Sequence, residues 1–508
     1  MKKISSIVMI LLFAIVLVSC GNKTEVSVTF ENVQVEQTSI RFDLKVDDPN
    51  KEITGSTVVY LHNEEGNIRN QETMEEAIDY FGIYFYGLET TTTFTLKVVV
   101  TIDRDAVEVG SYEFTTLTDQ EIVISSVEDF MKMKENRNGK FILESDIDFS
   151  GEEFVSPFNA SNAAFGGTFD GNGFALKNIN FKGITMYTGV FGYVSSGVIK
   201  NVTFDNVTIG TSETPLVTAT SSRVGIVTAY ATSQTARIEN VVIQNSSIVF
   251  TTSSTIQAYV GAVAAEYKGV MKDVEVLNTD IDVTTSTFGR IKIGGAVALL
   301  GADSVISQVY SQTNINFVTE ATNIRDDDVS QMIGGVVAQH VSGAKLSEII
   351  STGNIDIDVD YNTLVDTEKG IYQLFVGGLV GRANNDVQKG YYSGSITINH
   401  EKNEFEEPVT KQYRIGGLIG FYESNKPSNN LVRIGDGEIN LTIADDVILE
   451  ASQVFGFDRF EIVSDKGVYG TKHIMINAES KVEEDIVDTI TDLTDYFDSD
   501  WMDSYLEA

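Results

Sequence analysis

Cysteine is almost absent from this 508-residue chain, which contains a single one, Cys20. No disulfide can therefore form within the chain, and the fold must be held together by packing alone. Tryptophan occurs once and proline five times, against 42 glycines, a balance that indicates many turns. Only four histidines occur, and the sequence contains no HExxH, GxSxG or phosphate-loop motif. Zinc catalysis and nucleophilic catalysis therefore lack their usual groups.

Basic residues are also scarce: 36 lysines and arginines stand against 73 aspartates and glutamates, a formal net charge of −37. This excess keeps a chain soluble and repels anionic surfaces. Binding to phosphate backbones needs clustered lysine and arginine, and no such cluster is present, so we expect no nucleic-acid partner. Beyond the N-terminal region, no apolar run is long enough to span a membrane.

The first nineteen residues have the features of a secretion signal. Lys2 and Lys3 precede an apolar run over residues 7–18, which ends in Leu17-Val18-Ser19-Cys20. This ending resembles a lipobox, in which the cysteine is lipidated and becomes the first residue of the mature protein. We therefore predict a lipoprotein signal peptide over residues 1–19 and a lipidated tether over residues 20–26. The protein would be anchored by lipid on the extracytoplasmic face of the cell membrane. The alternative is an ordinary signal peptide with a chance cysteine.

Residues 27–118 are expected to form an antiparallel β-sandwich of about seven short strands. Ile40, Phe42 and Leu44 show the alternation of a half-buried strand, and a short helix is predicted over residues 73–80. The strand order near the end of this segment resembles that of a fibronectin type III or immunoglobulin-like module. That family usually has tyrosine where Phe94 stands, so the hydroxyl hydrogen bond of its tyrosine corner is missing here.

From Tyr187 onward the chain is repetitive, and each repeat contains a glycine within an apolar strand. These anchor glycines are Gly189, Gly225, Gly261, Gly295, Gly335, Gly378 and Gly417. A second strand follows each anchor, and its polar member is in turn Asn201, Asn240, Asp273, Gln308, Glu348, Lys389 and Asn430. A third short strand then brings apolar residues such as Ile281 and Ile355.

Three strands per repeat predict a parallel β-helix, expected to be right-handed, over residues 122–475. Stacked repeats place like side chains in continuous inward columns, so Ile281 and Ile355 should be buried. Glycine at the anchor would permit a bend, or a close backbone approach where a Cβ would clash. The fold class is therefore all-β, with a sandwich followed by a β-helix.

Helical caps are expected to protect the ends of the β-helix, because open sheet ends invite aggregation. Ser126 is a suitable N-cap for a helix over residues 126–134 that would bury Phe130 and Met133. Residues 476–508 are acidic, with apolar residues at helical intervals that include Trp501 and Tyr505. This segment is interpreted as a C-terminal cap, with a disordered tail as the alternative.

Taken together, the repeats and the segments 141–151 and 165–173 make the chain resemble the GLUG-motif family. The short motif is seen in Gly377-Gly378-Leu379-Val380-Gly381, whereas the second and third copies lack the second glycine. The resemblance covers about residues 122–475 and implies a repetitive surface protein. The family occurs on bacterial surfaces and in non-catalytic regions of immunoglobulin A proteases, and its biochemical role is mostly unassigned.

Carboxylates offer candidates for a calcium site. Asp146 and Asp148 begin a segment like the first half of a calcium loop, but Pro157 stands where an EF-hand needs glutamate. Asp356, Asp358 and Asp360 would share one face of a strand. A run at 326–328 adds three more aspartates. The alternatives are a plain turn and a solvated acidic face, so no cofactor is expected unless it is Ca²⁺.

Aromatic residues gather late in the chain and offer candidates for ligand binding. These are Tyr391, Tyr392, Tyr413 and Tyr422. Tyrosines beside carboxylates suit stacking on sugar rings, and one of the adjacent Tyr391 and Tyr392 should point outward. The alternative is packing within the core.

The sequence thus favours a non-catalytic, membrane-anchored surface lipoprotein that presents a β-helix for adhesion. Its partner would be a host or neighbouring macromolecule, or a glycan. Two alternatives remain: a β-helix polysaccharide lyase or hydrolase, and a structural component of a surface layer. An enzyme should show carboxylates converging with arginine or lysine in a cleft.

Overall fold

The computed structural model describes most of the chain, with gaps between the described segments. The described residues are 25–36, 38–74, 79–117, 121–287, 289–320, 329–360, 371–400, 410–426, 428–435, 438–444, 447–452, 454–459, 466–470, 473–477, 479–482 and 499–506. Nearly all regular structure in them is β, and the chain divides into two compact units. The first unit is Met1–Ile122 with Asn138–Lys140, and the second, here called the repeat unit, is Val123–Arg137 with Phe141–Ala508.

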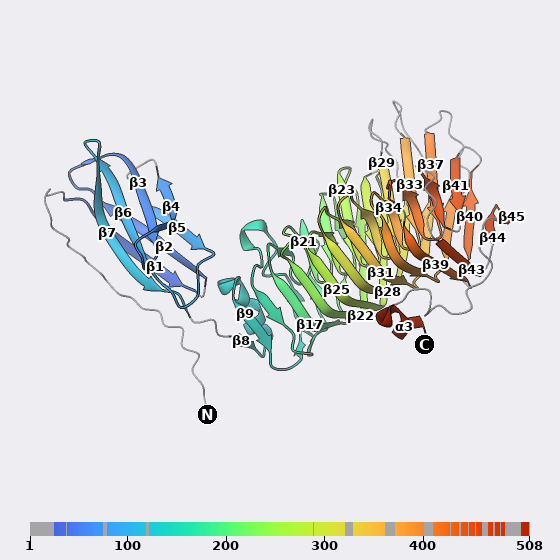
Figure 1. Ribbon diagram of the computed structural model, residues 1–508, viewed down its shortest axis with the longest axis horizontal. Helices are drawn as coiled ribbons and strands as arrows, with labels where there is room; N and C mark the ends of the chain where they lie inside the picture. Colours follow the sequence, from blue (N-terminus) through green and yellow to red (C-terminus); the bar gives the residue numbers. More distant parts are fainter. Residues whose placement is uncertain are drawn as a thin grey trace. The chain divides into compact units, whose positions relative to one another are not determined.

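The first unit contains two antiparallel sheets (Figure 1). One has the order β1 (Ser27–Val35), β2 (Ser39–Asp47), β5 (Tyr80–Tyr86). The other has the order β4 (Ile68–Met74), β3 (Ile53–His62), β6 (Thr93–Ile102), β7 (Asp105–Thr115). Buried residues of both sheets form one apolar cluster, which includes Phe42 from β2, Phe85 from β5 and Leu96 from β6. Phe94 is also in this cluster and stacks on Phe114 with ring centroids 5.7 Å apart.

The helix predicted over residues 73–80 is wrong where the structure describes this segment. Thr73 and Met74 end β4, and Thr73 pairs with Val58 of β3. Tyr80 already begins β5. Pairing with a neighbouring strand outweighs the local capping signal, and residues 75–78 lie outside the described residues.

The repeat unit is built from three sheets whose repeat strands pair in parallel. The 22-stranded sheet, here sheet I, contains β8 (Glu121–Ile124), β9 (Lys140–Leu143), β10 (Ile147–Asp148), β11 (Glu153–Phe154), β12 (Thr168–Asp170), β13 (Ala175–Lys177), β14 (Asn180–Phe181), β17 (Val198–Asp205), β18 (Thr208–Ile209), β19 (Leu216–Thr218), β22 (Arg237–Thr252), β25 (Val270–Thr285), β28 (Val305–Thr319), β31 (Lys345–Ser351), β32 (Ile355–Val359), β35 (Val387–Tyr392), β36 (Ile396–His400), β39 (Asn429–Gly435), β40 (Ile439–Ile443), β43 (Lys466–Gly470), β44 (His473–Ile476) and β45 (Glu479–Val482). The last pair, β44 and β45, is antiparallel.

Two 8-stranded sheets complete the repeat unit. Sheet II contains β15 (Tyr187–Thr188), β20 (Ser222–Gly225), β23 (Gln257–Gly261), β26 (Arg290–Gly294), β29 (Val329–Gly334), β33 (Ile371–Gly377), β37 (Thr410–Gly416) and β41 (Val447–Ser452). Sheet III contains β16 (Tyr193–Val194), β21 (Thr228–Ala231), β24 (Ala264–Tyr267), β27 (Val297–Leu300), β30 (Val337–His340), β34 (Val380–Ala383), β38 (Ile419–Tyr422) and β42 (Phe455–Asp458). From β15 onward, successive repeats supply strands to sheets II, III and I in turn, and equivalent strands pair in parallel (Figure 1).

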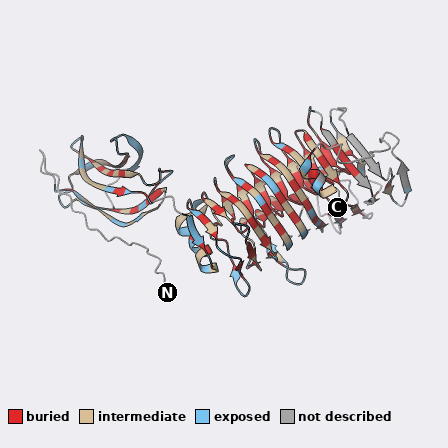
Figure 2. Ribbon diagram, turned by 60° about the horizontal axis from the view of Figure 1, so that its bottom comes forward, coloured by how far each residue is buried: buried red, intermediate tan, exposed pale blue. Residues whose placement is uncertain are grey.

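Inward side chains stack in columns from one repeat to the next, and Figure 2 shows burial alternating along the strands. Ile248, Ile281 and Ile315 are register partners and are at most 1% exposed. Ile355 continues this column and is fully buried, so the predicted inward positions of Ile281 and Ile355 are confirmed. Each isoleucine packs on the isoleucine of the next repeat, which no repeat could achieve alone.

The anchor glycines lie where neighbouring backbones approach closely. A Cβ on Gly295 would lie 1.9 Å from the carbonyl oxygen of Gly335, and one on Gly335 would lie 2.1 Å from that of Gly378. The predicted close approach is confirmed, and no larger residue fits without moving backbone. In these repeats the turn from sheet II to sheet III therefore depends on glycine. In earlier repeats Gly225 and Gly261 are in register with Gly294, so Ile226 and Ala262 occupy the position of Gly295.

The polar member of the second strand has a backbone role that sequence inspection did not reveal. Six of these residues have left-handed φ values between 51° and 59°: Asn201, Asn240, Asp273, Gln308, Glu348 and Lys389. Asparagine tolerates this conformation best among residues other than glycine. Their side chains also link repeats, since Asn240 donates its amide to Asn201 at 2.9 Å and Asn201 donates to Asp170 at 3.0 Å.

A short helix closes the N-terminal side of the repeat unit. α1 (Val127–Lys132) begins after Ser126, whose side chain accepts a hydrogen bond from the Asp129 backbone, so the predicted N-cap is confirmed. Phe130 is fully buried, with its ring edge-on to Phe149 and Phe191 at 5.6 and 5.8 Å. The chain continues into η1 (Met133–Asn136), and a further short turn is η2 (Ser161–Ala163).

The C-terminal helix does not lie over the end of the stack, which corrects the predicted cap. α3 (Asp500–Leu506) buries Met502 against Ile350 and Val432, with Tyr310 and Tyr391 in the same cluster. The four strand residues of this cluster are register partners: Tyr310 in β28, Ile350 in β31, Tyr391 in β35 and Val432 in β39. A helix over the end would contact the terminal repeat only, whereas α3 crosses the side of several repeats. Residues 483–498 lie outside the described residues.

Candidate functional site

The outward side chains of sheets II and III form two columns that meet along the repeat unit. The inward residues Val224, Val260 and Ile293 belong to the main core, so alternation directs their neighbours to the opposite face. Here the two columns together are called the outer seam. The sheet II column is Tyr187, Arg223, Tyr259, Lys292, Met332, Phe375, Arg414 and Glu450. The sheet III column is Tyr193, Tyr230, Glu266, Leu299, Gln339, Arg382, Phe421 and Phe457.

Three tyrosines and one arginine form the N-terminal part of the outer seam. The rings of Tyr187 and Tyr230 are nearly parallel, with centroids 5.9 Å apart, and Tyr193 stands edge-on to both. The Arg223 guanidinium lies 4.8 Å from the Tyr230 ring centroid, within cation–π range, and its Nε donates to Glu266 at 2.7 Å. This part of the seam therefore combines half-buried aromatic rings with one neutralised ion pair.

A buried lysine lies in the middle of the outer seam. Lys292 Nζ donates to the Tyr259 hydroxyl at 2.8 Å and lies 4.0 Å from the Tyr259 ring centroid. Only 7% of Lys292 is exposed, and burial lowers its pKa to about 8, although Glu266 acts in the opposite direction. Because Glu266 is hydrogen-bonded to Arg223, a cation–π contact and a neutral hydroxyl are the direct partners of this ammonium group.

Arginines and phenylalanines alternate in the C-terminal part of the outer seam. Arg414 lies between the rings of Phe421 and Phe457, 4.1 and 4.2 Å from their centroids, and donates to Glu450 at 2.7 Å. Arg382 pairs with Glu423 beside this stack. Burial raises the pKa of Glu423, but hydrogen bonds and charges from Arg382 and Arg459 outweigh burial and hold it below its usual value. Glu423 is thus kept as a carboxylate and is a poor proton donor.

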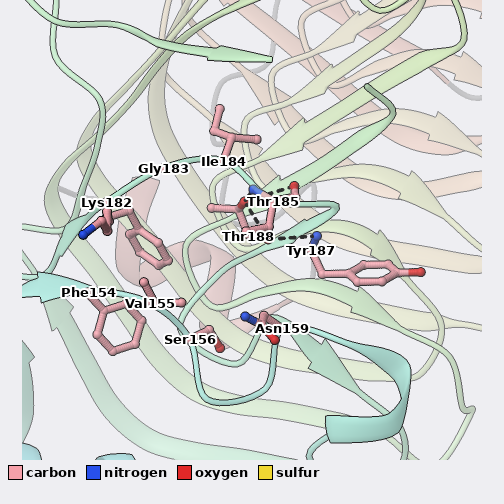
Figure 3. Close-up of a pocket in the computed structure, with 11 residues that line it drawn as sticks. Phe154, Val155, Ser156, Asn159, Lys182, Gly183, Ile184, Thr185, Tyr187 and Thr188 are labelled. Carbon is pink, nitrogen blue, oxygen red and sulfur yellow. Dashed lines mark hydrogen bonds between the residues drawn. The ribbon is translucent and has the colours of Figure 1, made fainter. Parts of the chain in front are cut away.

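A small cavity of about 210 Å³ lies at the N-terminal end of the repeat unit. Figure 3 shows two stretches that line it, Phe154 to Asn159 on one side and Lys182 to Thr188 on the other. Tyr187 belongs to both the cavity lining and the outer seam, and its ring extends away from Phe154 and Lys182 in the view of Figure 3. Tyr187 is therefore the residue that the cavity lining shares with the tyrosines of the outer seam.

Of the four tyrosines predicted to bind a ligand, three are corrected by the structure. Tyr392, Tyr413 and Tyr422 are fully buried, which rules out stacking on an external sugar. Tyr413 donates or accepts a hydrogen bond with His400 at 2.9 Å, and the Tyr392 hydroxyl donates to a backbone carbonyl. Tyr391 is the partly exposed member of its pair, and it packs in the cluster that receives α3. The physical reason is register: these strands direct their large rings into the core.

The aspartates considered for calcium are engaged separately. Asp146 accepts a hydrogen bond from Lys177 Nζ at 2.6 Å, and Asp148 accepts one from the Asn178 amide at 2.8 Å. Both pKa values are lowered, first by those side-chain hydrogen bonds and then by backbone hydrogen bonds. Ionisation would suit a cation, but Lys177 already neutralises Asp146.

The other carboxylates lie on an exposed surface. Asp356, Asp358 and Asp360 alternate with buried residues in and just after β32, as one face of a strand requires. Asp358 accepts a hydrogen bond from the Asn399 amide of the next repeat at 3.0 Å. Among the residues that the structure describes, no three histidine, cysteine or acidic side chains converge as a metal site would need. The run at 326–328 lies outside that part of the chain.

Cys20 and the predicted signal peptide lie outside the described residues, so the lipidation site stays a prediction. Within the described part of the chain, no helix is both long and apolar enough to cross a membrane.

A positional signal for the outer seam is present in the sequence but escaped notice. Its sheet II members stand two residues before the first glycine of each anchor, as in Arg223, Tyr259 and Lys292 before Gly225, Gly261 and Gly294. From the second repeat on, its sheet III members stand five residues after that glycine, as Tyr230 does after Gly225. Aligning the repeats on their glycines would have shown aromatic and charged residues recurring at both positions.

Comparisons with known proteins give no family for this chain. No family model and no curated protein matches it. Two solved structures of a Parabacteroides merdae β-glucuronidase match weakly, both with a TM-score of 0.14. One, with glycerol in its active site, has 9% identity and covers 35% of this chain and 29% of that chain. The other has 10% identity and covers 49% of this chain and 41% of that chain. At this TM-score the likeness carries no argument about fold or function.

Proposed function

We propose that the repeat unit is a β-helix and that the first unit is a fibronectin type III-like sandwich. Support for the β-helix comes from the recurring order of strands in sheets II, III and I and from the inward columns. Support for the sandwich comes from its two sheets, ordered β1-β2-β5 and β4-β3-β6-β7, around one apolar cluster. This architecture is consistent with the resemblance to the GLUG-motif family, which we propose as the relationship of the repeat unit.

We further propose that the protein is a lipid-anchored surface protein that binds a glycan or a macromolecule without turnover. The observation that carries this proposal is the N-terminal part of the outer seam, where the half-buried rings of Tyr187 and Tyr230 lie beside Arg223. The middle of the sheet II column, from Tyr259 to Phe375, is at most 7% exposed and contributes packing instead. Tyrosine and arginine are the residues that contribute most to binding energy at protein surfaces. Arg223 and Arg414 are ion-paired to Glu266 and Glu450 within the seam, and Arg382 to Glu423 beside it. The surface therefore suits recognition.

A catalytic role finds less support in the same contacts. Cleavage by two carboxylates requires one that stays protonated near neutral pH, which burial beside apolar groups can achieve. Glu423 instead has a lowered pKa because Arg382 and Arg459 hold its charge. Lys292 could serve as a base with its pKa near 8, but it is 7% exposed and is already engaged by Tyr259.

The anchoring proposal is tested by the variant Cys20→Ser. We expect the wild-type chain to partition with membranes and the variant to be released, because several acyl chains bind a bilayer firmly. Detergent phase separation and cell fractionation measure the difference. Membrane partitioning of the serine variant at the wild-type level would refute lipidation as the anchor.

Binding is tested with arrays of glycans and surface proteins, and turnover is followed by incubating the same polysaccharides with the protein. We expect retention of a ligand without unsaturated products or new reducing ends. Products that disappear with one substitution in the outer seam would establish the enzyme alternative instead.

A further inference from the structure

We infer that the cavity and the tyrosines at the N-terminal end of the outer seam form a binding site for one neutral sugar residue of a glycan. This inference rests on the proposed binding function and deepens it by naming the site and the ligand class. The site consists of Asn159 in the cavity lining, the rings of Tyr187, Tyr193 and Tyr230, and the Arg223–Glu266 pair. All of these residues belong to the repeat unit.

The first argument concerns hydrogen-bonding capacity. Within the described residues, the Asn159 amide and the hydroxyls of Tyr187, Tyr193 and Tyr230 make no protein hydrogen bond. All four residues are half-buried. Burial, and secondarily the Glu266 carboxylate, raise the pKa of Tyr230, so its hydroxyl keeps its proton and can donate. The site thus offers donors and acceptors that currently face solvent.

The second argument concerns shape. A sugar ring has an apolar face of C–H groups and an edge of hydroxyl groups, and therefore suits aromatic rings flanked by polar groups. Phe154 and Phe181 make one wall of the cavity apolar. The cavity volume of about 210 Å³ is below the range of about 300–1,000 Å³ that encloses drug-sized ligands. This volume suits a single ring, while the remainder of a glycan would follow the tyrosines.

The third argument concerns charge. Arg223 is paired with Glu266 at 2.7 Å with both side chains at most 16% exposed, whereas the pair of Lys182 and Glu153 at 2.8 Å is exposed to solvent. The cation beside the tyrosines is therefore already paired, and the exposed, solvent-screened Lys182 at the cavity contributes little to selecting an acidic or a basic ligand. A uronate or sulfated sugar would need an unpaired cation, and an acidic peptide would have the same requirement. A neutral glycan fits without breaking these pairs.

The test uses the purified full chain and neutral hexasaccharides of glucose, mannose, galactose and xylose. A hexauronate and an acidic peptide serve as probes of the competing classes. Titration calorimetry and saturation-transfer NMR measure binding to the wild type and to Asn159→Ala, Tyr187→Phe and Tyr230→Phe. The phenylalanine variants keep the ring packing, so the fold is retained. Tyr60→Phe in the first unit, at a half-buried tyrosine, is the matched control.

We expect a neutral hexasaccharide to bind, and each of the three substitutions to weaken binding about three- to tenfold, the value of one hydrogen bond. Tyr60→Phe should leave binding unchanged. If the hexauronate or the peptide binds instead, or if binding is insensitive to these substitutions and is lost in Arg414→Gln, the inference fails while the proposed function stands. If no ligand on the arrays or among these probes binds, both fail.

Discussion

The first unit and the repeat unit bury their apolar side chains in different ways. In the first unit, antiparallel strands enclose one cluster in which each position has its own set of neighbours. In the repeat unit, a position has the equivalent residue of the next repeat above and below it, as Ile281 has Ile248 and Ile315. A substitution in the first unit therefore disturbs a single set of neighbours, whereas a substitution in the repeat unit disturbs the repeats on both sides of it.

The largest difference is expected at glycine. In Gly335→Val, the Cβ would lie 2.1 Å from the Gly378 carbonyl oxygen. Gly378 has no room to move either, because a Cβ on it would lie 2.2 Å from the Gly417 carbonyl oxygen. We expect a loss of more than about 5 kcal/mol, because only backbone movement through successive repeats could relieve the clash. The contrast in the first unit is Gly66→Val, where φ is +81° but no atom lies within 4 Å.

Gly66→Val should cost about 1–2 kcal/mol from backbone conformation alone. Denaturant titration measures the free energy of unfolding of both variants, and hydrogen exchange assigns the loss to one unit or the other. Equal losses for the two glycines would remove the close approach as the reason for glycine at the anchor.

A smaller but still severe effect is expected for Ile281→Asp. Ile281 is fully buried in an apolar column, so an unpaired carboxylate there should cost several kcal/mol, about 3–5. The control is the adjacent exposed residue, Asp280→Asn, which should change stability little. Thermal melting compares them. A wild-type melting temperature for Ile281→Asp would show that the register of sheet I is wrong.

Lys292 provides a pH-dependent comparison within the repeat unit. Its folded pKa of about 8 lies below the usual 10.5, so the folded state binds fewer protons than the unfolded state between these values. Stability should therefore rise as pH increases from 8 to 10.5, and the full penalty, on the order of 3 kcal/mol, applies below pH 8. Lys292→Met should be more stable than wild type at pH 7.

The advantage of Lys292→Met should shrink towards pH 10.5, as unfolding curves at several pH values would reveal. The exposed Lys272→Met, in β25 of sheet I and in the preceding repeat, is the control and should show no such trend. If the difference in unfolding free energy between Lys292→Met and the wild type does not vary with pH, folding does not lower the pKa of Lys292.

The smallest effect is expected at the left-handed asparagines, which occur in both units. Asn240 has a φ of 52° and donates to Asn201, while Asn32 has a φ of 51° and donates to Asp43. Replacement by alanine should cost about 1–2 kcal/mol at either site, from the backbone conformation and one hydrogen bond. Asn240→Gly should recover the backbone part only. Chemical denaturation measures these differences in unfolding free energy. If Asn240→Gly is less stable than Asn240→Ala, the argument from backbone conformation is wrong.

Inward positions of the repeat unit could be predicted from the sequence because they follow a local rule. Alternation and recurrence identify Ile281 and Ile355, and the anchor glycine signals a close approach whichever strand lies opposite. Ser126 and Phe130 were likewise predictable, because capping and helical spacing act within a few residues. In each case the cause lies within one repeat or one turn.

The candidate site was not predictable to the same extent. Arg223 meets Glu266 only because residue positions on two different sheets face each other across a repeat boundary, a relation that local patterns do not contain. The ligand candidates Tyr413 and Tyr422 failed because alternation fixes which residues share a face but not which face is inward. The position of α3 depends on contacts between residues more than 100 positions apart, such as Ser499 with Glu348.

α3 also changes how the stack should respond to a pulling force. Tyr505 donates to Glu275 in β25, and Met502 packs on Val432 in β39, so one short helix joins repeats that do not touch each other. A simple stack would peel one repeat at a time from its free end. Here the repeats under α3 should instead resist as a block and release together once the helix detaches. A force–extension trace should then show small early steps followed by one long rupture.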